Sequence, residues 1–168
     1  MKLETRNQKQ KSRRREQFIL YAPLFFWIGV IFFLSTSQGS MGQTSRIIRP
    51  LLEFLFPGAP PETIIFYHGV IRKFAHFTEY AVLGLLACRA FSVTDVIRRL
   101  PYLLSIALVV LVAVIDETLQ SYNPARTGSP IDVGIDITGG LFAVAFYYLV
   151  VRRWQRRKLN RPAPRPSK

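Results

Sequence analysis

Apolar residues dominate four stretches of the chain, and each stretch is long enough to cross a lipid bilayer as a helix. Crossing takes about 20 mostly apolar residues, with a lower limit of about 17. The pattern predicts spans over residues 18–34, 61–91, 101–120 and 131–151. The first of these carries no charge, and the link YNPARTGSP before the last one is rich in turn residues. We therefore expect an all-α fold, an integral membrane bundle of about four transmembrane helices.

The segment between the first two spans follows a different pattern. Residues 46–56, RIIRPLLEFLF, are too few and too charged to cross the bilayer. The segment favours a short interfacial helix in the first outer loop, with its apolar side chains turned to the lipid or to the bundle. Those side chains are Ile47, Ile48, Leu51, Leu52 and Leu55. Pro60 and Pro61 predict the start of the next helix, because proline is tolerated in a first helical turn.

The composition is typical of a membrane protein. Of the 168 residues, 49% are hydrophobic, the mean hydropathy is +0.18 and the formal net charge is +13. Several spans use most of this length, so we expect one transmembrane domain over residues 17–151. Lysine and arginine are concentrated at the two ends, which predicts a disordered basic arm over residues 1–16 and a basic tail over residues 152–168. Anionic lipid explains this distribution more simply than nucleic acid, which we do not expect as a partner.

The positions of the positive charges also predict an orientation. Cytoplasmic loops carry an excess of Lys and Arg, so both termini and the link that holds Arg98 and Arg99 should be cytoplasmic. This arrangement agrees with an even number of spans. The polar motifs of the chain then all lie at the outer face of the membrane.

Ionisable side chains gather at that outer end of three predicted helices. At about 100° per residue, the polar residues of the second helix share one third of its circumference. They are Arg72, Lys73, His76, Glu79 and Tyr80. The third helix contributes Asp116, Glu117 and Gln120, the loop after it Arg126, and the fourth helix Asp132 and Asp136. Because buried charge in lipid is costly, we expect these residues to meet in one polar site.

Such a site permits several kinds of chemistry. The candidate catalytic residues are His76, Asp116 and Glu117, which could transfer protons. Arg126 and Lys73 could hold a phosphate or a carboxylate, the arginine by a two-pronged contact and the lysine as a point charge. The acids that could coordinate a hard divalent cation through oxygen are Asp116, Glu117, Asp132 and Asp136. No spacing among them is diagnostic, so the sequence identifies neither a metal nor a cofactor.

The same residues also fit structural roles. Acids that face basic side chains can form an ion-pair network that fixes how the helices pack. Gly139 and Gly140 are interpreted as packing residues, because no G-x-G-x-x-G or Walker pattern surrounds them. The single cysteine, Cys88, excludes an intrachain disulfide. A functional site is favoured by the convergence of distant motifs on one face of the membrane.

Several motifs together resemble the VanZ-like family of membrane proteins. They are RKFAHFTEYAVLG at residues 72–84, DETLQ at 116–120, Pro124 with Arg126, and DVGIDITGG at 132–140, with a weaker LSTSQ after the first span. The chain departs from the family pattern at Asp136, where asparagine is favoured, so a role that needs a neutral amide there does not carry over. By matching positions, the resemblance implies a polar core of Lys73, His76, Glu79, Asp116, Glu117, Gln120, Arg126 and Asp132.

The resemblance also implies a small multi-pass protein of the bacterial inner membrane, whose named relatives are associated with resistance to the glycopeptide antibiotic teicoplanin. It supplies no established reaction. Our first hypothesis is an outer-face pocket that binds or modifies a lipid-linked anionic headgroup, so the expected partners are membrane lipids and a lipid-linked envelope precursor. A non-catalytic module that binds a lipid or a partner is the alternative. A proton-coupled carrier is disfavoured, because the acids lie at one end of the spans and no inverted repeat is visible.

Overall fold

The computed structural model describes residues 2–36, 39–92, 100–124 and 128–159, and within these ranges all regular structure is helical. The helices are α1 (Lys2–Ser35), α2 (Met41–Leu55), α3 (Pro61–Phe91), α4 (Leu100–Ser121) and α5 (Pro130–Leu159). The expected all-α fold is confirmed. Three of the described helices contain a stretch long and apolar enough to cross a membrane, namely Gln17–Ser35, Leu100–Ser121 and Pro130–Trp154.

Helix boundaries agree with the expectations at most ends and differ at three. α2 begins at Met41, before the start expected at residue 46. α3 begins at Pro61, with Pro60 as its N-cap, as the two prolines predict. α1 begins at Lys2, so the segment expected to be disordered is helical up to the first apolar stretch. Residues 2–16 are rich in Lys, Arg, Gln and Glu, which are good helix formers. α5 likewise continues to Leu159, past the end expected at residue 151.

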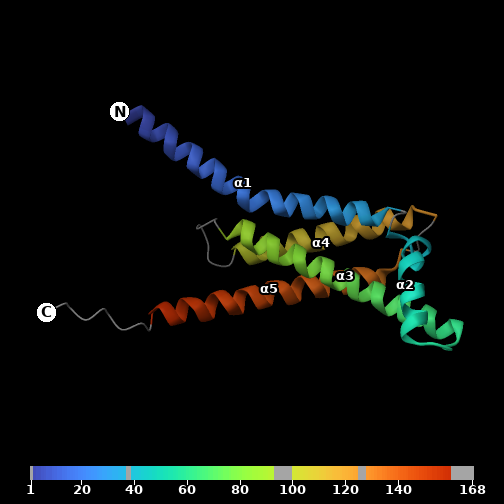
Figure 1. The fold of residues 1–168 in the computed structure, drawn as a ribbon. Helices are drawn as coiled ribbons and strands as arrows, with labels where there is room; N and C mark the ends of the chain where they lie inside the picture. The colour runs from blue at the N-terminus through green and yellow to red at the C-terminus, as the bar shows by residue number, and fades with distance from the viewer. Residues whose placement is uncertain (1, 37–38, 93–99, 125–127, 160–168) are drawn as a thin grey trace.

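Helix α3 is the centre of the bundle and packs against each of the other four helices. It is absent from the apolar candidate stretches because Arg72, Lys73 and Glu79 lie along its middle. In Figure 1, α1, α3, α4 and α5 run alternately in opposite directions. The start of α1 and the end of α5 lie at one end of the bundle, and α2 lies across the other. We call this second end the α2 end.

Apolar side chains fill the interior and also cover most of the outside. The buried core cluster consists of Leu24, Ile31, Tyr80, Leu83, Ala87, Ala90, Val109, Val112 and Ala113. Outward-facing Phe25, Leu111 and Phe142 are 67%, 57% and 61% exposed. An apolar surface this extensive is unfavourable in water and is typical of a protein that contacts lipid.

Glycines let α5 approach α3 and α4 closely where the polar residues meet. A methyl group at Gly139 would overlap the backbone carbonyl of Phe77, and one at Gly140 would overlap the side chain of Val109. On the α3 side, a Cβ at Gly84 would lie 2.8 Å from the Gly140 carbonyl oxygen. Close backbone contact of this kind is the usual role of small residues between helices in lipid.

Candidate functional site

A cavity of about 150 Å³ lies among α1, α2, α3 and α4 near the α2 end. Its walls are partly apolar, from residues that include Ile31, Leu34, Ile48 and Ile71. Its polar lining consists of Ser35, Thr44, His68, Arg72, His76, Glu79, Asp116 and Gln120. The cavity therefore combines acids, an arginine and two histidines inside a helical bundle with a largely apolar surface.

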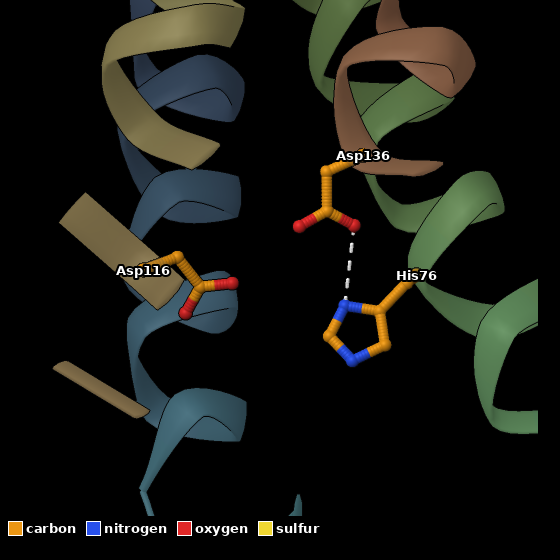
Figure 2. Close-up of side chains that lie close together, drawn as sticks. All are labelled: His76, Asp116 and Asp136. Atoms are coloured by element: carbon orange, nitrogen blue, oxygen red, sulfur yellow. Dashed lines mark ion pairs between the residues drawn. The ribbon is translucent and has the colours of Figure 1, made fainter. Parts of the chain in front are cut away.

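His76, Asp116 and Asp136 converge from three different helices. Figure 2 shows the two carboxylates on opposite sides of a gap, with the imidazole of His76 beside it. Nδ1 of His76 lies 3.2 Å from Oδ1 of Asp136. One donor atom from each of the three side chains lies within 4.8 Å of the others. All three residues are buried, so this cluster is shielded from solvent.

The Asp116 carboxylate is held in place by a tyrosine. The Tyr80 hydroxyl donates a hydrogen bond to Asp116 Oδ2 at 3.0 Å. Ser35 of α1 donates to the backbone carbonyl of Asp116 at 3.4 Å. A second contact from α1 is made by Trp27, whose Nε1 donates to the Glu79 carbonyl at 2.9 Å. These bonds fix the position of α1 against α3 and α4 around the cavity.

Glu117 points to a different neighbour from Asp116. Its Oε1 accepts a hydrogen bond from the backbone N–H of Ser129, the residue just before α5. Its other oxygen, Oε2, is buried without a hydrogen-bond partner among the described residues. Glu117 therefore joins the end of α4 to the start of α5, and it is not part of the cavity lining.

Arg72 is the arginine that lines the cavity. Its Nη2 donates to Gln120 Oε1 at 3.4 Å, which links α3 to α4. Its Nε is buried and makes no hydrogen bond within the part of the chain that the structure describes. A buried guanidinium N–H without an acceptor is costly. Arg72 thus offers the cavity a donor suited to an anionic oxygen.

A comparison of the sequence with models of protein families identifies the family of this chain. The family model described as VanZ/LLP1 matches residues 18–151, which is most of the chain. The chain belongs to the VanZ/LLP1 family. Searches of curated proteins and of solved structures give no match. Membership of the VanZ/LLP1 family and the apolar helices together indicate a membrane protein.

Most of the candidate residues of this VanZ/LLP1 protein lie at the α2 end of the bundle. His76, Glu79, Asp116 and Gln120 line the cavity. Tyr80 and Asp136 lie next to it through their contacts with Asp116 and His76, respectively. Asp132 is half-buried one turn before Asp136. Their roles in binding or catalysis remain predictions.

The anion clamp expected from Lys73 and Arg126 stays a prediction, and the structure describes only one of its two residues. Lys73 is exposed and does not line the cavity. Arg126 lies outside the described residues, as do Arg98 and Arg99. Arg72, the neighbour of Lys73, lines the cavity instead. Adjacent residues on a helix point about 100° apart, so when Arg72 turns inward, Lys73 faces outward.

His68 is a cavity residue of the VanZ/LLP1 chain that the sequence analysis did not select. Its Nε2 lies 3.1 Å from Thr44 Oγ1, and its Nδ1 lies 3.3 Å from Ser45 Oγ. These contacts join α2 to α3 beside the cavity, which His68 and Thr44 both line. His68 precedes His76 by about two helical turns, so both lie on the same face of α3. The spacing of the two histidines could have indicated from the sequence that His68 belongs to the same site as His76.

Proposed function

We propose that this VanZ/LLP1 protein is a multi-pass protein of the bacterial plasma membrane whose α2-end cavity binds a lipid-linked anionic headgroup. In this proposal α3 is a fourth span that hides its polar face inside the bundle, and α2 is the interfacial helix. Ile47, Leu51 and Phe54 of α2 are 77%, 52% and 82% exposed, which suits immersion in lipid. Leu52 of the same helix is buried against the bundle.

The observation that carries the headgroup proposal is that Arg72 lines the cavity and that its buried Nε–H has no acceptor among the described residues. An arginine binds phosphate oxygens through charge-assisted hydrogen bonds, which are about twice as strong as neutral ones. The apolar cavity walls formed by Ile48 and Ile71 can accept the first methylene groups of the lipid chain. A phosphate attached to a long hydrocarbon satisfies both features.

An enzymatic version adds chemistry on the bound headgroup. Asp116 or Glu117 would act as the base, and His76 would act as the acid or orient a reacting group. Asp116 and His76 both line the cavity, whereas Glu117 reaches the start of α5. The geometry therefore favours Asp116 over Glu117 as a group that reaches a ligand in the cavity.

The binding proposal is tested by measuring lipid retention of the purified protein. We expect vesicles that contain phosphatidylglycerol or a polyprenyl phosphate to bind more strongly than vesicles of phosphatidylcholine. Comparison of the two anionic lipids separates an ordinary phospholipid from a lipid-linked envelope precursor. Arg72→Gln should weaken anionic lipid binding about 10-fold or more, because a hydrogen bond to a charged group contributes about 1.5–3 kcal/mol. Equal binding of anionic and neutral lipids would contradict the proposal.

A matched control is available on the same helix. Arg89 is exposed and lies at the opposite end of α3. Arg89→Gln removes the same charge from the chain without changing the cavity, so it should retain the lipid preference of the wild type. An equal loss in both variants would indicate a general effect of net charge.

A non-catalytic role is the second candidate, because the basic and acidic groups of the cavity also suit binding alone. Asp116→Asn separates the two versions if the variant keeps its fold. A binding module should retain lipid binding in this variant, whereas an enzyme should lose turnover of the headgroup. Turnover is measured by mass spectrometry of lipids extracted from vesicles that contain the protein.

A further inference from the structure

Buried carboxylate oxygens without partners face the gap between α3, α4 and α5. Asp116 Oδ1 and Asp136 Oδ2 make no hydrogen bond with any described residue. The two residues are 2% and 0% exposed, so bulk solvent does not reach these oxygens. An unpaired buried carboxylate costs several kcal/mol unless a cation or a proton compensates it. Both oxygens belong to the convergent group in Figure 2.

No basic side chain among the described residues forms an ion pair with Asp116, and His76 is the basic partner of Asp136. Arg72, the basic residue of the cavity, directs its Nη2 to the amide of Gln120. Asp132, one helical turn before Asp136, and Glu117, next to Asp116, add two further carboxyl groups at this end of the helices. The cluster therefore has more acid than the adjacent basic groups neutralise.

We propose that His76, Asp116 and Asp136 bind a divalent transition-metal ion such as Zn²⁺ or Mn²⁺. The donor set of one imidazole nitrogen and two carboxylate oxygens suits these metals better than Ca²⁺, which prefers six to eight oxygen ligands. Three protein ligands also leave coordination positions open. This set differs from the all-oxygen set expected from the sequence, because it includes His76 and omits Glu117 and Asp132.

The distances allow a shared ion after small side-chain movements. Ligand atoms of a tetrahedral ion lie about 3.3–3.6 Å apart, because each bond to zinc is about 2.0–2.2 Å long. The three donor atoms already lie within 4.8 Å of one another. Side-chain movements that shorten the longest of these separations by about 1 Å would bring the three atoms to coordination distance. The helices that carry them are fixed by close packing at Gly84, Gly139 and Gly140.

The surroundings of the cluster resemble those of a metal site. Tyr80 donates to Oδ2 of Asp116 and leaves Oδ1 free for an ion. Hydrogen bonds of this kind orient the ligands of metal sites and tune their affinity. Asp116 and His76 also line the cavity, which provides a route for the ion and places its open positions toward a ligand there. The ion site needs no lipid, so it can be tested apart from the headgroup proposal.

The test uses Mn²⁺ as the probe on the purified, chelator-treated full chain in detergent. Binding removes the electron paramagnetic resonance signal of free Mn²⁺, and titration gives the stoichiometry. We expect a stoichiometry close to one ion per chain, with displacement by Zn²⁺ and persistence in a large excess of Mg²⁺. Asp136→Asn and His76→Gln should each weaken binding at least about 10-fold. Tyr80→Phe, which removes an orienting bond, should weaken it about 10- to 100-fold.

Glu62→Gln is the matched control, because it makes the same acid-to-amide change on α3 at an exposed position. It should bind Mn²⁺ as the wild type does, and circular dichroism of each variant checks that the helices remain. A wild-type protein that binds no Mn²⁺ or Zn²⁺ would overturn the proposal and favour a proton shared by the two aspartates. Wild-type affinity in both Asp136→Asn and His76→Gln would overturn it as well.

Discussion

Tyr80 and Asp116 are joined across the interface of α3 and α4 by a hydrogen bond of 3.0 Å from the phenol hydroxyl to Oδ2. Both residues are enclosed, at 0% and 2% exposure. The other carboxylate oxygen, Oδ1, has no hydrogen-bond partner among the described residues. The tyrosine is therefore the side chain that anchors Asp116 at the edge of the cavity.

Replacing Tyr80 by phenylalanine should destabilise the protein with little change in shape. The variant loses the hydrogen bond to Asp116 and leaves both of its buried carboxyl oxygens unpaired, at a cost of about 1–3 kcal/mol. The measurement is the free energy of unfolding in detergent. Tyr122→Phe makes the same change at a side chain that is 82% exposed, and should alter stability by less than about 0.5 kcal/mol. Equal effects of the two changes would show that the buried bond contributes nothing specific.

Alanine at Gly139 should disturb both the packing and the cluster. The added methyl group would overlap the carbonyl of Phe77, so α5 must move away from α3. Overpacking of this kind costs about 1–3 kcal/mol. It should also weaken Mn²⁺ binding, because Phe77 follows His76 directly and Asp136 lies one turn before Gly139. The measurements are the unfolding free energy and the Mn²⁺ titration.

Gly134 provides the control on the same helix. No neighbouring atom lies within 4 Å of a Cβ built at Gly134. Gly134→Ala should therefore leave stability unchanged or raise it by up to about 1 kcal/mol, since alanine has a higher helix propensity. If Gly139→Ala behaved in the same way, close contact would not be the role of Gly139.

The sequence could predict which side chains of each helix face the interior, because residue spacing alone defines the faces of a helix. His76, Asp116 and Asp136 are each turned inward, as the period of 3.6 residues and the neighbouring small residues indicate. The start of α3 at Pro61 follows from the local restriction that proline imposes. These features depend on residues within one helix, so they need no knowledge of the tertiary structure.

Partner choice between helices could not be predicted in the same way. Glu117 and Asp116 are adjacent in sequence, yet one bonds Ser129 and the other bonds Tyr80. Which acid meets which base depends on the angles at which the helices cross and on their relative positions along the bundle. The close contacts at the glycines determine both. The sequence therefore indicated a polar site. It did not show that Asp116 and Asp136 belong to the cluster with His76, whereas Glu117 bonds to the residue before α5.

His68 should control the position of α2 over the cavity. Leucine at this position keeps a similar size but loses the contacts with Thr44 and Ser45 at 3.1 and 3.3 Å. At about 0.5–1.5 kcal/mol for each hydrogen bond, amide hydrogen exchange in α2 should become about 10-fold faster or more. Phe74→Leu, at a side chain that is 70% exposed on the same helix, should leave this exchange unchanged. Unaltered exchange in His68→Leu would mean that the apolar contacts of Leu52 alone hold α2.

The orientation of the bundle can be decided by thiol labelling of intact cells. Cys88 is fully buried, and replacing it by alanine gives a background without thiols. In that background Asn123→Cys, just after α4, should react with a membrane-impermeant reagent added from outside. Ser92→Cys, an exposed site after α3 at the opposite end of the bundle, should react only after lysis. Both predictions follow from the excess of Lys and Arg near the termini, which favours a cytoplasmic location for that end. The reverse labelling pattern would place the cavity and the His76–Asp116–Asp136 cluster on the cytoplasmic face. The bound headgroup would then belong to a lipid of the cytoplasmic leaflet.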